Sequence, residues 1–195
     1  MNKSIMKRRA FIRNGLCAGT VLAFNANILS AQATTSIKAP NKLSEGLSSQ
    51  SKAFMKMLNI NYPIVQAPAA GAVTTELVRA VANKGALGGL PLTWHTNEEA
   101  QASLNAIQNA TSGVFFANYV LNFEPHSLNT ALNAGVKIIQ FSWGLPDQSI
   151  VTKLKEAGVI MGIQVTSEAN AKAAIKLGAD YLVCQGTEAG GHVHA

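Results

Sequence analysis

The stretch DYLVCQGTEAGGH, residues 180–192, joins a short apolar run to a glycine-rich turn. Residues 181–184 are typical of a buried strand. Glycines directly after a strand permit positive φ and let the backbone approach a ligand closely. His192 closes the turn and is the residue type that transfers protons near neutral pH. The stretch predicts a strand followed by a ligand-binding turn with a catalytic histidine. The alternative is a plain strand, a tight turn and a surface histidine.

Apolar runs also recur upstream of this stretch, and amphipathic segments separate them. We predict strands at 63–68, 86–90, 114–121, 136–142, 159–165 and 180–185. We predict helices at 74–84, 96–109, 126–133, 146–158 and 167–177, bounded by capping residues, proline and glycine. Continuously apolar strands that alternate with amphipathic helices indicate a parallel sheet covered by helices.

Polar residues stand toward the carboxyl ends of most of the predicted strands, notably Gln66, Asn118, Ser142, Gln164 and Gln185. In a (β/α)₈ barrel all the loops at the carboxyl ends of the strands contribute to the active site. A doubly wound sheet instead concentrates its site at one switch point, and no GxGxxG motif follows the first predicted strand. We therefore predict an α/β fold of the (β/α)₈ TIM-barrel type. It is incomplete, because about six parallel strand–helix units are present.

The charge of the chain is concentrated at its amino terminus. The net charge is +6, but residues 1–33 carry five basic residues and no acidic one, which leaves six minus five, or +1, for the rest. The composition, 48% hydrophobic and 13% charged, is that of a globular protein. No basic stripe suggests nucleic-acid binding, and no His, Cys and Asp set has the spacing of a metal site.

Residues 1–33 are typical of a twin-arginine export signal. Arg8 and Arg9 precede two apolar residues, a moderately apolar stretch follows, and the small-x-small pattern at 31–33 predicts cleavage after Ala33. The alternative is an amino-terminal membrane anchor, although the apolar part is shorter than a span requires. We predict a periplasmic protein without a stable membrane anchor after cleavage. A flexible linker at 34–52 and a domain at 53–195 would follow the signal. Cys184 would then be the sole cysteine, so no intramolecular disulfide could form.

Five short motifs occur in the order seen in one enzyme family. They are PIVQAP at 63–68, FFAN at 115–118, FSWG at 141–144, QV at 164–165 and QGTEAGGH at 185–192. In this set the chain resembles the nitronate monooxygenases, formerly called 2-nitropropane dioxygenases, over residues 59–192. The resemblance implies a flavoprotein oxidoreductase that uses FMN in a TIM barrel and acts on a small nitroalkane or nitronate with oxygen.

The resemblance also implies roles for individual residues. His192 would be the base that removes the α-proton of a nitroalkane, whose nitro carbon becomes a carbonyl as nitrite is released. The residues that would contact FMN are Ala67, Pro68, Asn118, Gln164, Gln185, Gly190 and Gly191. The family's last two strand–helix units, which hold the FMN phosphate, have no counterpart before Ala195, so the chain looks truncated at its carboxyl end. Ala69 stands where many relatives have methionine.

Two alternatives stay open at the level of sequence. One is a related FMN-dependent NAD(P)H reductase, of the quinone or enoyl-acyl carrier protein type, which shares a similar Gly-Gly-His ending. The other is an inactive remnant of such an enzyme. A partner chain that supplies the missing strands would restore a barrel, but we expect an inactive fragment instead.

Overall fold

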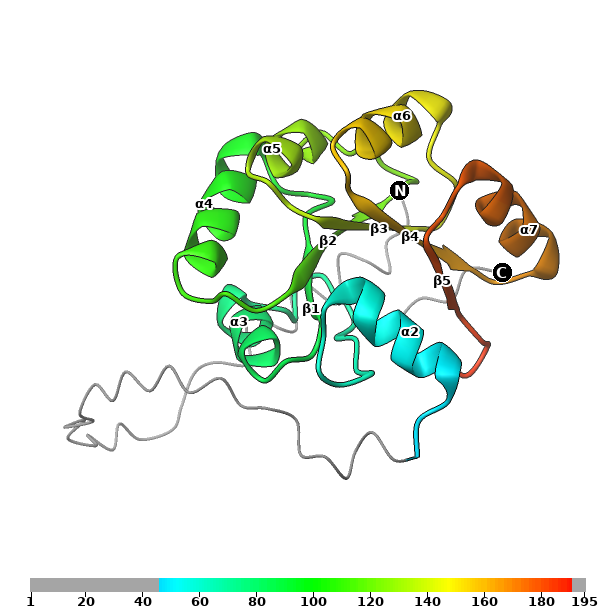
Figure 1. The fold of residues 1–195 in the computed structure, drawn as a ribbon. Helices are drawn as coiled ribbons and strands as arrows, with labels where there is room; N and C mark the ends of the chain where they lie inside the picture. Colours follow the sequence, from blue (N-terminus) through cyan, green and yellow to red (C-terminus); the bar gives the residue numbers. More distant parts are fainter. Residues whose placement is uncertain (1–45, 191–195) are drawn as a thin grey trace, which may run out of the picture. The chain divides into compact units, whose positions relative to one another are not determined.

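The computed structural model describes residues 46–190 (Figure 1). The predicted signal at 1–33, most of the predicted linker, and the site residues Gly191 and His192 lie outside the described residues. Within residues 46–190, no helix is both long and apolar enough to cross a membrane.

A parallel sheet of five strands forms the centre of the described chain. The strands are β1 (Gly88–Pro91), β2 (Phe115–Val120), β3 (Ile138–Ser142), β4 (Ile160–Val165) and β5 (Tyr181–Cys184). They lie in the order β1-β2-β3-β4-β5, and every neighbouring pair is parallel. The predicted α/β alternation and the side-by-side order of these strands are confirmed.

Five helices alternate with the strands and lie in a ring outside the curved sheet (Figure 1). They are α3 (Thr75–Asn83), α4 (Asn97–Gln108), α5 (Leu128–Asn133), α6 (Gln148–Glu156) and α7 (Glu168–Leu177). Thr74, Thr96, Asp147 and Ser167 accept hydrogen bonds from first-turn backbone N–H groups. Because such caps stabilise a helix start by about 1 kcal/mol, the sequence specifies these boundaries locally.

The predicted first strand at 63–68 is the main departure from expectation. The structure has only an isolated parallel bridge there, between Val65 and Leu87. Its hydrogen bonds, from Gln66 N to Leu87 O and from Leu87 N to Ile64 O, place the segment beside β1 as expected. Proline has no N–H to donate, and prolines at both ends of the segment shorten its ladder. Hence the described residues contain five strands and a bridge rather than six strands.

Helix α2 (Ser49–Leu58) begins earlier than the predicted linker allowed. Ser48 caps it by accepting a hydrogen bond from the Ser51 N–H, so residues 49–52 are helical. Leu58 packs with Leu87, Phe116 and Ile138 in a buried cluster at the amino ends of the strands. The helix therefore covers the end of the sheet opposite to the one where the predicted site residues gather.

Candidate functional site

The polar side chains of the inner face lie toward the carboxyl ends of the strands. Register pairing runs across the whole sheet through Pro91, Asn118, Gln140, Gly162 and Tyr181. Below this row, at the amino ends, the inner face is apolar. Within the row, Asn118 and Gln140 are the buried polar side chains, and they are available for a site.

Asn118 is the buried member of the predicted site among the described residues. Its side chain is 3% exposed. Its Oδ1 accepts two hydrogen bonds from β3, one from Gln140 Nε2 at 3.2 Å and one from Ser142 Oγ at 3.0 Å. A buried amide with two such partners is held in one orientation, because freeing either partner leaves a buried polar group unpaired.

Tyr181, on strand β5, extends this arrangement across the same face of the sheet. Its hydroxyl donates to Gln140 Oε1 at 3.3 Å, across the intervening strand β4. The ring passes over Gly162, where any Cβ would collide with the tyrosine ring. Phe54 of α2 supports the ring edge-on, with centroids 5.7 Å apart. Burial, and secondarily the Asp180 carboxylate, raises the pKa of Tyr181, so the hydroxyl keeps its proton.

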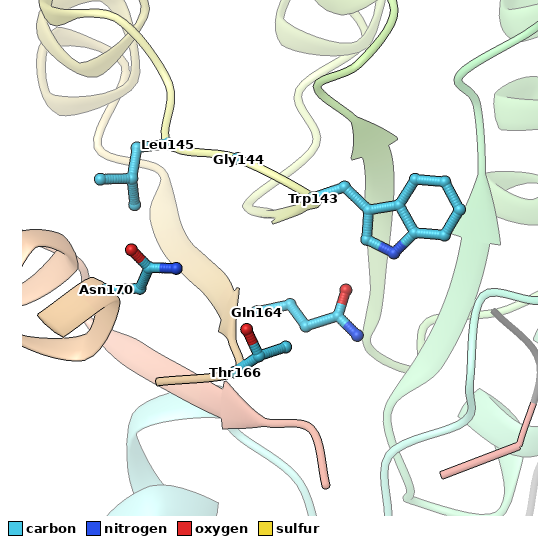
Figure 2. A pocket seen from close by; sticks show the side chains of 6 residues that line it. All are labelled: Trp143, Gly144, Leu145, Gln164, Thr166 and Asn170. Carbon is cyan, nitrogen blue, oxygen red and sulfur yellow. The ribbon is translucent and has the colours of Figure 1, made fainter. Parts of the chain in front are cut away.

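Gln164 borders a pocket of about 310 Å³ at the carboxyl end of β4, together with Trp143, Gly144, Leu145, Thr166 and Asn170. In Figure 2 the Gln164 side chain extends from β4 in the direction of the Trp143 indole. The backbone after β3 is unusual, with φ of 59° at Trp143 and 145° at Gly144. Positive φ at a bulky residue is costly, and such strain is typical of functional loops.

Gln66 carries an orphaned polar atom. Its Nε2 donates to Gly89 O at 3.3 Å, whereas its buried Oε1 has no hydrogen-bond partner among the described residues. Gly89 permits the two segments to lie this close, since a Cβ there would be 2.5 Å from the backbone carbonyl oxygen of Gln66. An unpaired buried acceptor costs about 1–3 kcal/mol. The atom is therefore suited to a bound group that donates an N–H.

Ala67 and Pro68 follow Gln66 directly. Ala67 is exposed and Pro68 is half-buried. The Ala69 N–H bonds back to Ala67 O at 2.9 Å. At the predicted flavin-contact position this tight turn therefore exposes backbone and short side chains only.

The glycine-rich turn begins as predicted at the end of β5. The Gln185 N–H donates to Val165 O at 2.9 Å, which continues the ladder one residue past the strand. Gln185 is half-buried and Gly190 is exposed. Glu188 folds back over Gly186, where a Cβ would contact its carboxylate. Since Gly191 and His192 lie outside the described residues, the structure does not test their predicted roles.

A second hollow, of about 590 Å³, lies at the carboxyl end of β1 between α3 and α4. His95 and Glu99 contribute its polar groups. Trp94 lines it as well and stacks edge-on against Phe123, with ring centroids 5.4 Å apart.

Sequence reasoning did not single out Gln140 or Tyr181. Gln140 is a polar residue inside the apolar run 138–142, and that was the available signal. Tyr181 reads as an ordinary strand residue. The described residues contain no group of three or more His, Cys, Asp or Glu side chains that could hold a metal ion.

The comparisons with known proteins agree with this arrangement. The family model described as nitronate monooxygenase matches residues 51–130 and 123–194. A probable nitronate monooxygenase of Staphylococcus aureus (strain JH9) is 29% identical over 175 residues, covering 70% of this chain and 49% of the relative. One from Staphylococcus haemolyticus is 30% identical, covering 69% and 48%. The chain thus spans about half the length of the curated relatives it matches.

Two solved structures share the fold. FabK from Thermotoga maritima is 25% identical, with a TM-score of 0.69 over 73% of this chain and 46% of FabK. The nitroalkane oxidase of Streptomyces ansochromogenes is 26% identical, with a TM-score of 0.65 over 72% and 50%. The parallel sheet described above therefore corresponds to part of these larger folds. With the family model matching most of its length, the chain belongs to the nitronate monooxygenase family.

Proposed function

We propose that this chain contributes the flavin-ring site and the base of an FMN-dependent nitronate monooxygenase. Two observations on the same sheet carry the proposal in a chain of this family: the orphaned Gln66 Oε1 and the buried, oriented amide of Asn118. A donor and an acceptor of this kind suit a heterocycle that offers both N–H and carbonyl groups. The residues present therefore fit the isoalloxazine ring of FMN.

The proposed contacts to FMN come from two loops and two strands. The backbone at Ala67 and Pro68 would lie against the ring, and Asn118 and Gln164 would offer their amides. The glycine-rich turn would complete the site through Gln185, Gly190 and Gly191. FMN, when bound, supplies the electron transfer and the reaction with oxygen.

The protein's own step is proton transfer and positioning. His192 would take the α-proton from a neutral nitroalkane and so generate the nitronate. The walls of the pocket beside Trp143 and Gln164 would hold the small substrate and limit the access of water. The overall result would be a carbonyl compound and nitrite.

A second candidate is the FMN-dependent NAD(P)H reductase that the sequence also allowed. The fold is shared with FabK as closely as with the nitroalkane oxidase, so likeness of fold alone does not separate the two.

An assay of the flavin-loaded protein, extended with the second half of a relative's barrel, tests the proposal. We expect nitrite release from propyl-2-nitronate at a rate far above that of NADH oxidation with quinone or enoyl thioester acceptors. The matched control is the Asn118→Leu protein, which loses the amide and should lose both flavin and nitrite release. Steady NADH oxidation without nitrite release would instead establish the reductase.

We further propose that residues 1–33 direct export to the periplasm through the twin-arginine route. Changing Arg8 and Arg9 to lysine should retain the precursor in the cytoplasm, because the paired guanidinium groups are the feature that distinguishes this signal. The check is amino-terminal sequencing of cell fractions, with Lys3→Arg as the control substitution in the same segment. A mature protein that still begins at Thr34 in the double variant would contradict the twin-arginine route.

A further inference from the structure

The hydrogen bonds among Tyr181, Gln140 and Asn118 have a definite direction. The Tyr181 hydroxyl keeps its proton and donates to Gln140 Oε1. The Gln140 amide must then point its Nε2 the other way, and that group donates to Asn118 Oδ1. Ser142 Oγ donates to the same oxygen. Both lone pairs of the Asn118 carbonyl are thereby occupied.

A free asparagine can present either its oxygen or its nitrogen to a ligand, because the two ends of the amide have nearly the same shape. Asn118 does not have this choice. If its amide flipped, Nδ2 could still donate to the Ser142 hydroxyl, but it would face Gln140 Nε2, so Gln140 would have to flip as well. The Gln140 Nε2 would then face the Tyr181 hydroxyl, and the buried Tyr181 O–H would lose its acceptor. Each unsatisfied buried group is costly, so the orientation is set by β3 and β5 rather than by the ligand.

We propose that Tyr181 is a positioning residue that acts through Gln140 to keep Asn118 Nδ2 as the donor offered to the bound group. Position 118 is then specific for a hydrogen-bond acceptor, such as a carbonyl oxygen or an unprotonated ring nitrogen. The identity of that acceptor as part of FMN rests on the proposed function, whereas the orientation of the amide does not.

Gly162 makes the hydrogen bond between Tyr181 and Gln140 sterically possible. Its lack of a side chain lets the Tyr181 ring cross β4 and reach Gln140 on β3. The other buried tyrosine, Tyr119, lies on the helix-covered face and makes its hydrogen bond to Ser127 Oγ at 3.4 Å. Burial raises the pKa of Tyr119 to about 12. Tyr119 therefore matches Tyr181 in burial and chemistry and follows Asn118 in the chain, but its hydroxyl bonds to Ser127 rather than to Gln140 or Asn118.

The test compares Tyr181→Phe with Tyr119→Phe in the full chain labelled with ¹⁵N, without added flavin. Each change removes one buried hydroxyl and retains the ring. In Tyr181→Phe the side-chain amide signals of Gln140 and Asn118 should shift and exchange faster with solvent, because Gln140 loses the contact that orients it. In Tyr119→Phe both pairs of signals should stay where they are. Unmoved signals in Tyr181→Phe, or equal shifts in both variants, would overturn the proposal.

FMN titration of the same proteins provides the second readout. Tyr181→Phe should weaken FMN binding roughly threefold to tenfold, Asn118→Asp should weaken it further, and Tyr119→Phe should leave it unchanged. If no protein binds FMN even when extended with the second half of a relative's barrel, the proposed function fails, and the amide signals still decide the orientation. If Tyr181→Phe does not fold, the unsubstituted chain provides the test. Slow solvent exchange of the Gln140 side-chain amide protons, with cross-relaxation from them to Asn118, supports the proposal. The absence of both refutes it.

Discussion

Replacing His192 by alanine is expected to lower the turnover of neutral nitroalkanes by roughly 10²–10⁴-fold and to leave the turnover of preformed nitronates nearly intact. A neutral nitroalkane must first lose its α-proton, and a positioned base speeds that transfer. A nitronate has already lost that proton, so the base has nothing to remove. The measurement is kcat/KM for both substrates, followed by nitrite release in an active form of the enzyme.

His126→Ala is the matched control for this experiment. His126 follows β2 at the start of the α5 region, its side chain is 68% exposed, and its nearest charged neighbour is Glu124 at 3.7 Å. The change should alter neither substrate's turnover. Equal losses on both substrates in His192→Ala would assign His192 to substrate binding or flavin positioning instead of proton abstraction.

A polypeptide of residues 34–195 is expected to bind FMN weakly. Its affinity should be roughly a hundredfold or more below that of a form extended with the second half of a relative's barrel. Each charge-assisted hydrogen bond to a phosphate is worth about 1.5–3 kcal/mol, and the family resemblance places the phosphate-binding turns after residue 195. Within the described residues, β5 and the Val65 segment each pair on one side only. Such open edges leave the inner face accessible to water and prone to association.

Riboflavin provides the control, because it has the same ring and no phosphate. The polypeptide should bind riboflavin and FMN with equal, weak affinity, whereas the extended form should prefer FMN. The measurement is fluorescence titration, followed by gel filtration with detection at the flavin absorbance bands. A stoichiometric yellow monomer that releases nitrite would refute the expectation. A yellow oligomer or a complex with a second chain would identify a partner that supplies further strands to the polypeptide.

Much of the fold was readable from local sequence. The helix starts at Thr74, Thr96 and Ser167 follow from hydroxyl caps that act within one turn. The strands follow from short, continuously apolar runs that alternate with amphipathic segments. The first strand was overestimated, because its two prolines limit the ladder and its pairing depends on what lies at the sheet edge, which is a property of the assembled sheet.

The candidate site divides in the same way. Asn118 and Gln164 were found from sequence because polar residues at the carboxyl ends of parallel strands meet at one edge. The five short motifs and their order along the chain were enough to indicate the family, and the family model confirms that membership. The predicted roles of His192 and the flavin contacts stay predictions.

Only the tertiary structure revealed how Asn118 is oriented. Tyr181 lies 41 residues from Gln140 along the chain. Their contact requires a glycine, Gly162, at the point where the ring crosses the intervening strand β4. No local pattern encodes that contact, because it depends on the register of three strands brought together by two helical crossovers. The sequence by itself determined which residues form strands, helices and caps, since those preferences act over a few residues. The structure decided which polar atoms pair inside the sheet, since buried hydrogen bonds are satisfied across strands.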